Sequence, residues 1–436
     1  MKEPVSQEVF HKILAEMDID DVSRTSIRQC QMLGNKLEEA KGESFSHLEI
    51  GVPGIPACPI GIAAQKEALD KGLSAIYPPV QGIPELKKNA AAFVKAFIDV
   101  DIDPKCIVPT VGSMQGSMTS VLECSQIDKK KDTILYICPG FSAHGRQPDI
   151  LGIKNLYFDV YEYRSERLRE KLESYLKEGN IAAILYSNPN NPAWICLSEE
   201  ELAIIGDLAN KYDVIILEDM AYLCMDFRKD MSVPYQPPFQ STVARYTDNY
   251  VLLLSGSKIF SYAGERIGIS CISNKLYDRE YPALKEKWGI GRFGDNFILN
   301  YLYINTSGTS HSAQYALSAM FKAAAEGKYN FVKELREYAL RAHRSRELFE
   351  KNGFHLVYDK DIEQTISDGF FYTVEYKSMG NRELLEALLR CGIIAIPLNT
   401  TGSGQAGIRV CVSRLVTDDD FRKLDENLKL FVKLVS

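Results

Sequence analysis

The sequence lacks paired cysteines, long apolar runs and an excess of positive charge. Its ten cysteines never form a C-x-x-C pair, and most lie in or beside apolar stretches, as Cys138 and Cys271 do, which is typical of buried free thiols. No segment reaches the roughly 18 uninterrupted apolar residues of a membrane span, and the first residues, MKEPVSQEVFHKIL, contain no apolar signal-peptide core. We therefore expect a cytoplasmic protein with no membrane partner.

The charge balance argues against a nucleic-acid partner as well. The formal net charge is −7, whereas binding to phosphates requires clustered Lys and Arg that displace counterions. The basic triplet at residues 129–131 is short and is typical of a solvated loop. With 45% apolar and 25% charged residues, the composition indicates a globular enzyme.

Residues 105–272 alternate short apolar runs with helical patterns. Near-continuous apolar runs separated by helices are typical of a mostly parallel sheet that is covered on both faces. We predict a doubly wound α/β domain over residues 61–315, with a seven-stranded sheet. Ser198 and Glu201 form a capping box that predicts a helix from there to about Lys211. The seven strand candidates are CIVPTV, TILYIC, NLYFDV, AAILYS, VIILED, YVLLLS and IGISCI.

The two flanks differ from this middle region. Residues 1–60 contain one helical start and the passage GVPGIPACPIG, and residues 316–436 contain long amphipathic helices and the strand candidates FFYTVEY, IIAIPL and IRVCVS. We predict that both flanks build one smaller α+β domain. GSGQAG at 402–407 fits a dinucleotide-binding pattern, but a strand follows it instead of a helix, so we interpret the match as chance.

Four features follow predicted strands of the large sheet. They are Lys258 in SGSKIFSYAGERIG, the small-residue turn VGSMQGS at 111–117, the loop SNPNNP at 187–192, and LEDMAY, which contains Asp219 and Tyr222. Each alone has a structural explanation, because tight turns need glycine and a lysine at a strand end is usually solvated. Together they matter, since open α/β sheets bind ligands beyond the carboxyl ends of their strands.

These residues suggest one kind of ligand. A turn rich in small residues at a helix N-terminus binds phosphate, and a carboxylate such as Asp219 at the end of an apolar strand needs a cation nearby. An aldehyde-bearing aromatic cation with a phosphate, pyridoxal phosphate, fits Lys258, Asp219 and Arg266 together. From about residue 51 to residue 409 the chain resembles the fold-type I, class I/II aminotransferases related to aspartate aminotransferase.

The resemblance implies how the cofactor is held. In that family, the lysine of S-x-S-K-x-x-x-x-x-G-x-R-x-G carries pyridoxal phosphate as a Schiff base, and here that lysine is Lys258. The implied phosphate ligands are Ser255, Ser257 and Arg266, together with the backbone N–H groups of Ser113 and Met114.

Further motifs imply contacts with the ring and with a second subunit. NPNNP resembles N-P-x-N-P, whose second asparagine, here Asn191, bonds the ring hydroxyl. D-x-A-Y supplies Asp219 for the pyridine nitrogen and Tyr222 for the same hydroxyl, and PGF supplies Phe141 as the ring stacked on the cofactor. YPPVQGIPELKK resembles the segment whose tyrosine, here Tyr77, reaches the phosphate of the partner subunit. The resemblance therefore implies a homodimer with shared sites.

The substrate contacts implied by the resemblance are Arg409, Asn191 and Gly51. Arg409, in GIRVCVS, corresponds to the arginine that binds the substrate α-carboxylate, a task for which a planar guanidinium with two parallel donors is suited. Arg414 is a nearby competitor, but an odd separation places the two on opposite faces of a continuous strand. We prefer Arg409.

The expected activity is transfer of an amino group between an L-amino acid and a 2-oxo acid. Lys258 serves as general base and acid at the substrate Cα, Asp219 keeps the pyridine nitrogen protonated, and Tyr222 assists at the ring. No metal site is expected. Two alternatives stay open: β-elimination by a pyridoxal-phosphate C–S lyase in the same fold, and a non-catalytic sensor that binds the cofactor.

Two departures from the family pattern bear on specificity. The family often continues N-P-T-G, where this chain has Ala193 and Trp194; the tryptophan either shapes the pocket or belongs to the core. Dicarboxylate-specific members use a second arginine from the partner, and the residues around Arg292 do not match that motif, so aspartate specificity is not predicted. In place of a clear cation this region contains aromatic residues, whose spacing fits an ordinary apolar helix face equally well. They are Phe293, Phe297, Tyr301 and Tyr303.

Overall fold

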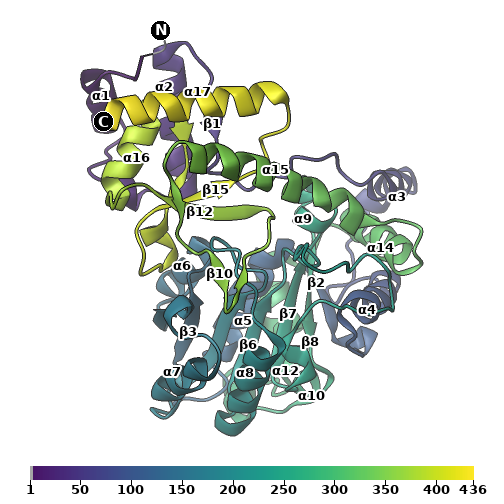
Figure 1. Cartoon of the computed structure of the whole chain (residues 1–436). Coiled ribbons are helices and arrows are strands. Elements are labelled where there is room, and N and C mark those ends of the chain that lie inside the picture. The colour runs from purple at the N-terminus through teal and green to yellow at the C-terminus, as the bar shows by residue number, and fades with distance from the viewer. Residues whose placement is uncertain (1–2) are drawn as a thin grey trace.

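A large sheet with helices on both faces lies below a smaller layer of strands and helices in the computed structural model, which describes residues 3–436 (Figure 1). Both ends of the chain lie in the smaller upper part. The carboxyl ends of the central strands face the junction between the two parts. The predicted fold class, an α/β fold with a mostly parallel seven-stranded sheet, is confirmed.

The large sheet contains all seven predicted strands, in the order β2-β8-β7-β6-β5-β3-β4. Only β8 is antiparallel, and it runs against both of its neighbours. Every residue of the three central strands β5, β6 and β7 is buried, which explains their continuous apolar runs. The strands are β2 (Ile107–Thr110), β3 (Thr133–Cys138), β4 (Lys154–Asp159), β5 (Ile181–Ser187), β6 (Ile215–Asp219), β7 (Tyr250–Ser255) and β8 (Gly268–Ile272).

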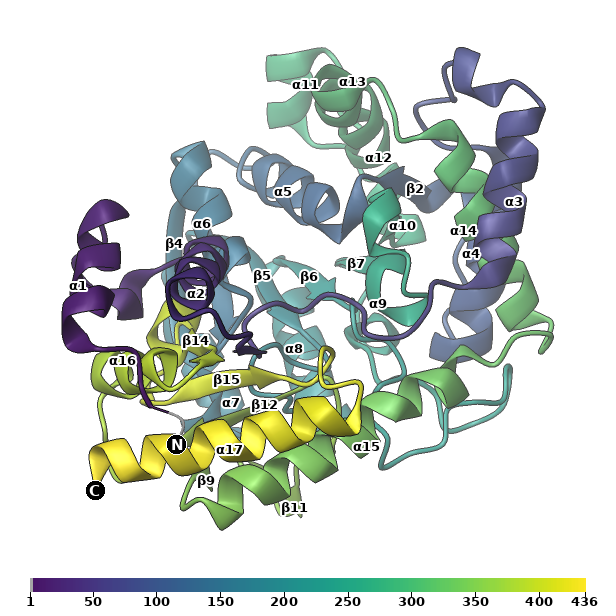
Figure 2. The same ribbon diagram turned by 90° about the horizontal axis from the view of Figure 1, so that it is seen from above.

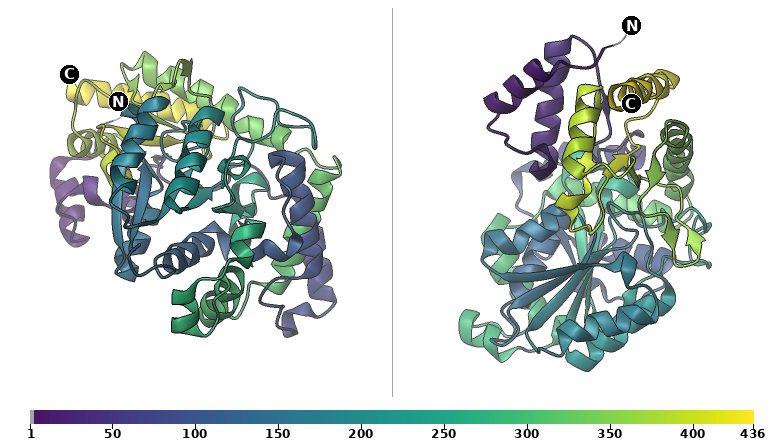
Figure 3. Two further views of the ribbon diagram at one scale, coloured as in Figure 1. Left: turned by 90° about the horizontal axis from the view of Figure 1, so that it is seen from below. Right: turned by 60° about the vertical axis from the view of Figure 1, so that its left-hand side comes forward.

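Helices cover the sheet on both faces (Figure 3). Helices α5 (Gly112–Cys124) and α6 (Ser142–Leu151) lie on one face, and α7 (Glu166–Leu176) and α8 (Glu199–Tyr212) lie on the other (Figures 1 and 2). The capping box predicted at the start of α8 is confirmed. The other helices of this part are α3 (Pro59–Asp70), α4 (Pro84–Ile98), α9 (Gly256–Ile259), α10 (Asn274–Asp278), α11 (Pro282–Trp288), α12 (Phe293–Asn296), the π-helix Phe297–Leu302, α13 (Tyr303–Thr306) and α14 (His311–Ala325).

The smaller part combines both ends of the chain. Its main sheet is antiparallel, with the order β14-β15-β12-β9, and β1 pairs with β13 beside it. The strands are β1 (Ser46–His47), β9 (His355–Leu356), β10 (Lys360–Asp361), β11 (Gln364–Thr365), β12 (Phe371–Glu375), β13 (Ile393–Ile394), β14 (Ile396–Pro397) and β15 (Ile408–Cys411). The helices are α1 (Gln7–Glu16), α2 (Ile27–Lys41), α15 (Phe331–Lys351), α16 (Asn381–Arg390) and α17 (Asp418–Val435). Short 3-10 turns occur in both parts of the molecule, at Val22–Arg24, Leu73–Ala75, Pro104–Cys106, Val160–Glu162, Val243–Arg245, Ala263–Glu265 and Leu398–Thr401.

The domain limits expected from the sequence can be located on these elements. The limit between residues 315 and 316 falls inside α14, a helix that packs along α3 and α4. The limit at residue 60 falls in the first turn of α3. The exact division of the chain into domains stays a prediction. In the described part of the chain, no helix has the length and apolarity needed to cross a membrane.

One extended segment links the two parts across their junction. Residues 48–58, which we call the strap, run from β1 past α9 to α3 (Figure 2). At its start, the carbonyl of Leu48 accepts a hydrogen bond from the N–H of Cys411 at 3.0 Å, and at its end Cys58 donates to the carbonyl of Phe260 at 3.1 Å. The strap is therefore tied to β15 and to the chain just after α9.

Candidate active site

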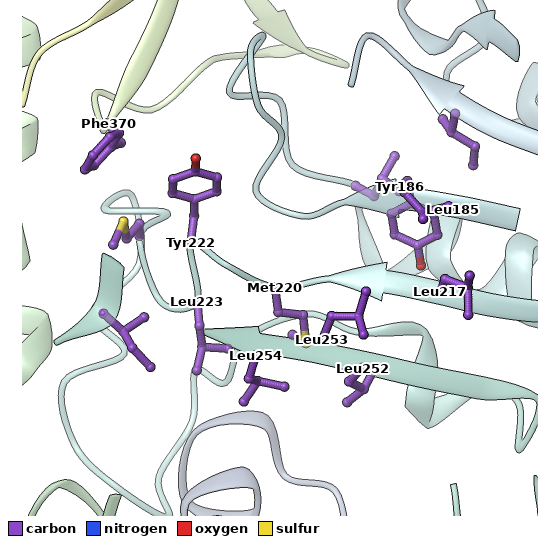
Figure 4. Packing of buried hydrophobic residues seen from close by; sticks show 14 of the residues in the cluster. Leu185, Tyr186, Leu217, Met220, Tyr222, Leu223, Leu252, Leu253, Leu254 and Phe370 are labelled. Carbon is purple, nitrogen blue, oxygen red and sulfur yellow. The ribbon is translucent and has the colours of Figure 1, made fainter. Parts of the chain in front are cut away.

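The residues expected to hold a ligand gather beyond the carboxyl ends of the central strands. Asp219 is the last residue of β6, Ser255 is the last residue of β7, and Asn191 follows β5 by four residues. Tyr222 and Phe370 lie side by side above the packed leucines of these strands (Figure 4), with ring centroids 5.6 Å apart. This is where open α/β sheets place their ligands.

Lys258 lies in the short helix α9, directly after β7. Its Nζ donates a hydrogen bond to the carbonyl of Gly51 in the strap and lies 5.3 Å from the ring centroid of Phe370. Burial, followed by the positive charges of Arg409 and Arg266, lowers the pKa of Lys258 to about 8. An amine with that pKa is present in its neutral, nucleophilic form at a much larger fraction than a solvated lysine.

Asp219 is only 5% exposed. Its carboxylate accepts a hydrogen bond from the N–H of Ala221 at 3.1 Å, and burial raises its pKa to about 7. The nearest titratable partner is Nε2 of His144, at 3.7 Å. Burial lowers the pKa of His144 to about 4, so this imidazole is neutral at pH 7. Asp219 thus faces no cation among the described residues.

The role of His144 at this site was not predicted from the sequence. It lies in the first turn of α6, three residues after Phe141, and the two rings meet edge to face at 5.4 Å. Its Nε2 is buried and has no hydrogen-bond partner among the described residues. The spacing of three from an expected ring-stacking residue, which places both side chains on one side of a helix, was the available signal.

A chain of polar contacts links Asn191, Tyr222 and Arg409. The amide Nδ2 of Asn191 donates to the hydroxyl of Tyr222 at 3.3 Å, and its Oδ1 accepts from Nη1 of Arg409 at 3.2 Å. Three residues that are far apart in the sequence therefore meet at one point. Since Asn191 has one donor group and one acceptor group, it can orient the phenol and the guanidinium at the same time.

Arg409 is 2% exposed, and Arg414 is exposed. The guanidinium of Arg409 lies 4.5 Å from the ring centroid of Phe371, and its Nη2 donates to the carbonyl of Glu49. Its Nε is buried without a partner, and no carboxylate pairs with it among the described residues. A buried cation without an anion is costly, so this position is suited to a carboxylate ligand.

The residues expected to hold a phosphate also lie together. Ser255 accepts a hydrogen bond from the N–H of Ser257 at 3.2 Å, and the hydroxyl of Ser257 accepts from Nη1 of Arg266 at 3.2 Å. Gly112, at the N-terminus of α5, has φ +66°, and a Cβ there would lie 2.6 Å from Nη2 of Arg266. Ser113 follows in the first turn of α5 and Met114 is next to it.

Tyr77 is 87% exposed in this chain. The expected contact with a partner subunit therefore stays a prediction. Arg292 forms an ion pair with Asp295 at 3.2 Å. Phe293 and Phe297 are fully buried in the α12 and π-helix region, in agreement with an ordinary apolar face.

Trp194 is both a core residue and a neighbour of the site. It is fully buried, its indole N–H donates to the hydroxyl of Ser367 at 3.0 Å, and its ring meets the ring of Tyr222 edge to face at 5.5 Å. It also lies 6.1 Å from Phe371, the ring under Arg409. Trp194 therefore belongs to the core and also lies beside the site, so the two explanations given by the sequence, a core residue or a residue that shapes the pocket, are compatible.

These residues fit pyridoxal phosphate. The N-terminus of α5, the two serines and Arg266 suit a phosphate, and the buried, cation-free Asp219 suits a protonated pyridine nitrogen. The lowered pKa of Lys258 suits an amine that reacts with an aldehyde. Within residues 3–436 no cluster of His, Cys, Asp or Glu is arranged to hold a metal ion.

Comparisons with known proteins identify a family for most of the chain. Residues 47–428 match the family described as aminotransferase class I and II. The aspartate aminotransferase of Pyrococcus horikoshii is 26% identical over 252 residues, 57% of this chain and 59% of that protein. That of Bacillus subtilis is 24% identical over 241 residues, 55% of this chain and 58% of that protein. The chain thus spans little more than half the length of the curated relatives it matches.

Structural similarity to solved structures covers more of the chain than these sequence matches do. A double mutant of the Thermus thermophilus aspartate aminotransferase is similar with a TM-score of 0.73 over 94% of this chain and 96% of that chain. The sequence identity is 18%, so this likeness shows a common fold.

Proposed function

Because the chain belongs to the class I and II aminotransferase family, we propose that it is a pyridoxal-phosphate-dependent aminotransferase. The reaction moves an amino group between an L-amino acid and a 2-oxo acid, with Lys258 as the Schiff-base lysine. When bound, the cofactor supplies the aldehyde for that link and the electron sink for the carbanion at the substrate Cα.

One observation carries the proposal. Asp219 is a buried carboxylate that forms no ion pair with a lysine or arginine, and Arg409 is a buried guanidinium that forms no ion pair with a carboxylate, among the described residues near Lys258; the buried Glu49 acts on Arg409 only from beyond ion-pair distance. Both deficits are removed by a protonated pyridine ring bound together with an α-carboxylate.

The side chains then have defined tasks. Lys258, whose pKa of about 8 lies near neutrality, would act as the general base and acid that moves a proton at the substrate Cα. Arg409 orients the substrate through two parallel hydrogen bonds to its carboxylate, and the carbonyl of Gly51 positions the amine of Lys258. Asn191 and Tyr222 bond the ring hydroxyl.

The phosphate and the ring face have their own proposed contacts. The phosphate ligands are the hydroxyls of Ser255 and Ser257, the guanidinium of Arg266 and the N–H groups of Ser113 and Met114. Phe141 stacks on the ring. Gly112 supports this arrangement, because only a residue without Cβ leaves Arg266 where it lies.

We also propose a homodimer that acts in the cytoplasm. Tyr77 and the neighbouring Ile76 are both exposed in the single chain, as residues of a subunit contact would be. Within residues 3–436 all ten cysteines are free thiols, which fits a reducing compartment. The proposed partner supplies Tyr77 to the phosphate of the neighbouring site.

The visible absorbance spectrum of the purified protein tests the proposal. With pyridoxal phosphate added, we expect a band that single L-amino acids bleach, and no such response in Lys258→Ala. Release of a 2-oxo acid without ammonia, and return of the band when a 2-oxo acid is added, identify transamination. Release of ammonia and pyruvate from cysteine conjugates alone would instead identify β-elimination, and a band that no amino acid bleaches would identify a sensor.

A further inference from the structure

The strap is fixed at its second glycine by helix α15. The N–H of Gly54 donates to the hydroxyl of Tyr338 at 3.1 Å, and its carbonyl accepts from Nη1 of Arg341 at 3.0 Å. Three residues earlier, the carbonyl of Gly51 binds the amine of Lys258. The position of the lysine amine is therefore linked, through three residues of strap, to two side chains of α15.

The same guanidinium also binds the chain that follows β15. Nη1 of Arg341 donates to the carbonyl of Ser413 at 2.9 Å, and Ser413 comes four residues after Arg409. The strap lies so close here that a Cβ on Gly54 would overlap the carbonyl of Ser413. One nitrogen thus joins the segment that holds the lysine amine to the segment that holds the substrate arginine.

Burial makes this arrangement specific. Arg341 is 6% exposed, and its Nε donates to the carboxylate of Glu337, one turn earlier, at 2.9 Å. Burying a cation costs free energy unless hydrogen bonds offset the loss of water. If this side chain only filled space, an apolar residue would do so without that cost. The planar guanidinium lets Nη1 bind both carbonyls while Nε binds Glu337, which a single ammonium cannot do in the same geometry.

Tyr338 is linked to the lysine by a second route, through Phe370. The ring of Tyr338 is fully buried, and its centroid lies 4.6 Å from that of Phe370. The amine of Lys258 lies 5.3 Å from the ring centroid of Phe370. Tyr338 therefore acts on the amine through the strap on one side and through Phe370 on the other.

We infer that Tyr338 and Arg341 are positioning residues that set the separation between the amine of Lys258 and the guanidinium of Arg409. The inference rests on the proposed function, since it concerns the same two groups. By fastening the strap to the end of β15, the pair keeps the proton-transferring amine and the carboxylate-binding arginine in register across the junction of the two parts. Neither side chain is among the residues proposed to hold the substrate or the cofactor.

The test compares Arg341→Lys and Tyr338→Phe with a matched control, Arg344→Lys. Arg344 lies one turn along α15, is half-exposed and pairs with Asp418 at 2.6 Å, so its replacement alters the same helix without touching the strap. We expect the two strap variants to lose about 100-fold in kcat/KM, mainly in kcat, because an ångström of misplacement costs about that much. The control stays within about twofold, as surface changes do.

A second readout needs no turnover. In the cofactor-free protein, reductive methylation of Lys258 by formaldehyde with cyanoborohydride as the reductant reports the pKa of its amine, with Lys258→Ala subtracted as background. We expect the midpoint to rise from about 8 toward the value of a solvated lysine in both strap variants, because the amine loses its buried position. Thermal unfolding shows that each variant is folded at the assay temperature.

The possible results separate cleanly. A fall in thermal stability with an unchanged kcat and an unchanged methylation midpoint would show that the pair only supports the fold, and it would overturn the inference. If the wild-type protein itself transaminates nothing, the proposed function fails, whereas the methylation midpoint still decides whether the strap positions Lys258.

Discussion

The carboxylate of Asp219 lies 3.7 Å from Nε2 of His144, and both side chains are buried at the end of β6. Burial moves the two pKa values in opposite directions, raising that of Asp219 to about 7 and lowering that of His144 to about 4. The histidine is therefore neutral and cannot compensate the carboxylate. The compensation has to come from a ligand, which couples stability to cofactor binding.

Asp219→Asn should therefore stabilise the cofactor-free protein at pH 8. The raised pKa means that the folded state binds a proton more tightly than the unfolded state, so the cost of Asp219 is absent below pH 3.8 and grows until about pH 7. Removing the charge recovers at most about 4 kcal/mol at pH 8. Urea unfolding of both proteins at pH 8 and pH 5 measures this difference, which should shrink by more than half at pH 5.

The opposite effect is expected once the cofactor is present. Asp219→Asn cannot pair with the pyridine nitrogen, so pyridoxal phosphate should bind more weakly and turnover should fall further than binding.

The unfolding experiment needs one control. The buried Glu218 has a pKa raised to about 7, so it also titrates near neutrality, and the unfolding free energies must be compared between the wild-type and Asp219→Asn proteins at each pH and not between two pH values of one protein. Equal stability of the two proteins at pH 8 would contradict the uncompensated charge.

Arg409→Lys and Arg414→Lys should behave differently. The buried Arg409 has an unpaired Nε, and replacing it by a single ammonium removes the parallel pair of donors, so KM for the amino acid should rise about 100-fold. The exposed Arg414 is the matched control and should leave KM unchanged. Steady-state kinetics decide, and a larger KM effect from the exposed residue would reverse the assignment.

Trp194 and Gly369 are expected to be coupled. A Cβ on Gly369 would overlap the indole of Trp194, so Gly369→Ala should cost about 1–3 kcal/mol in the wild-type protein. In a Trp194→Ala background, the same change should cost much less, because the added methyl enters the space that the indole leaves. A double-mutant cycle of unfolding free energies gives the coupling directly. Additive costs would show that backbone shifts already relieve the contact.

Local sequence patterns predicted the large sheet and the motif residues because both depend on neighbours in the chain. Continuous apolar runs mark buried parallel strands, and Ser198 with Glu201 marks the start of α8. The contacts of Arg341 could not be predicted in this way, and for His144 the only local signal was its spacing of three from Phe141. Arg341 binds Gly54 across 287 positions, and nothing in the local pattern of α15 distinguishes it from the exposed arginine one turn later.

Tyr77 provides the test of a shared site. The residue is 87% exposed in the single chain, so the proposed contact is one between subunits. Tyr77→Ala and Lys258→Ala should each be nearly inactive. Co-expressed, they should form hybrid dimers in which one of the two sites has both an intact lysine and an intact tyrosine. If the two variants pair at random, about half of the dimers are hybrids, and about a quarter of wild-type activity is recovered. Co-expression with no recovery, while each variant forms dimers by sedimentation, would place Tyr77 outside the partner's site.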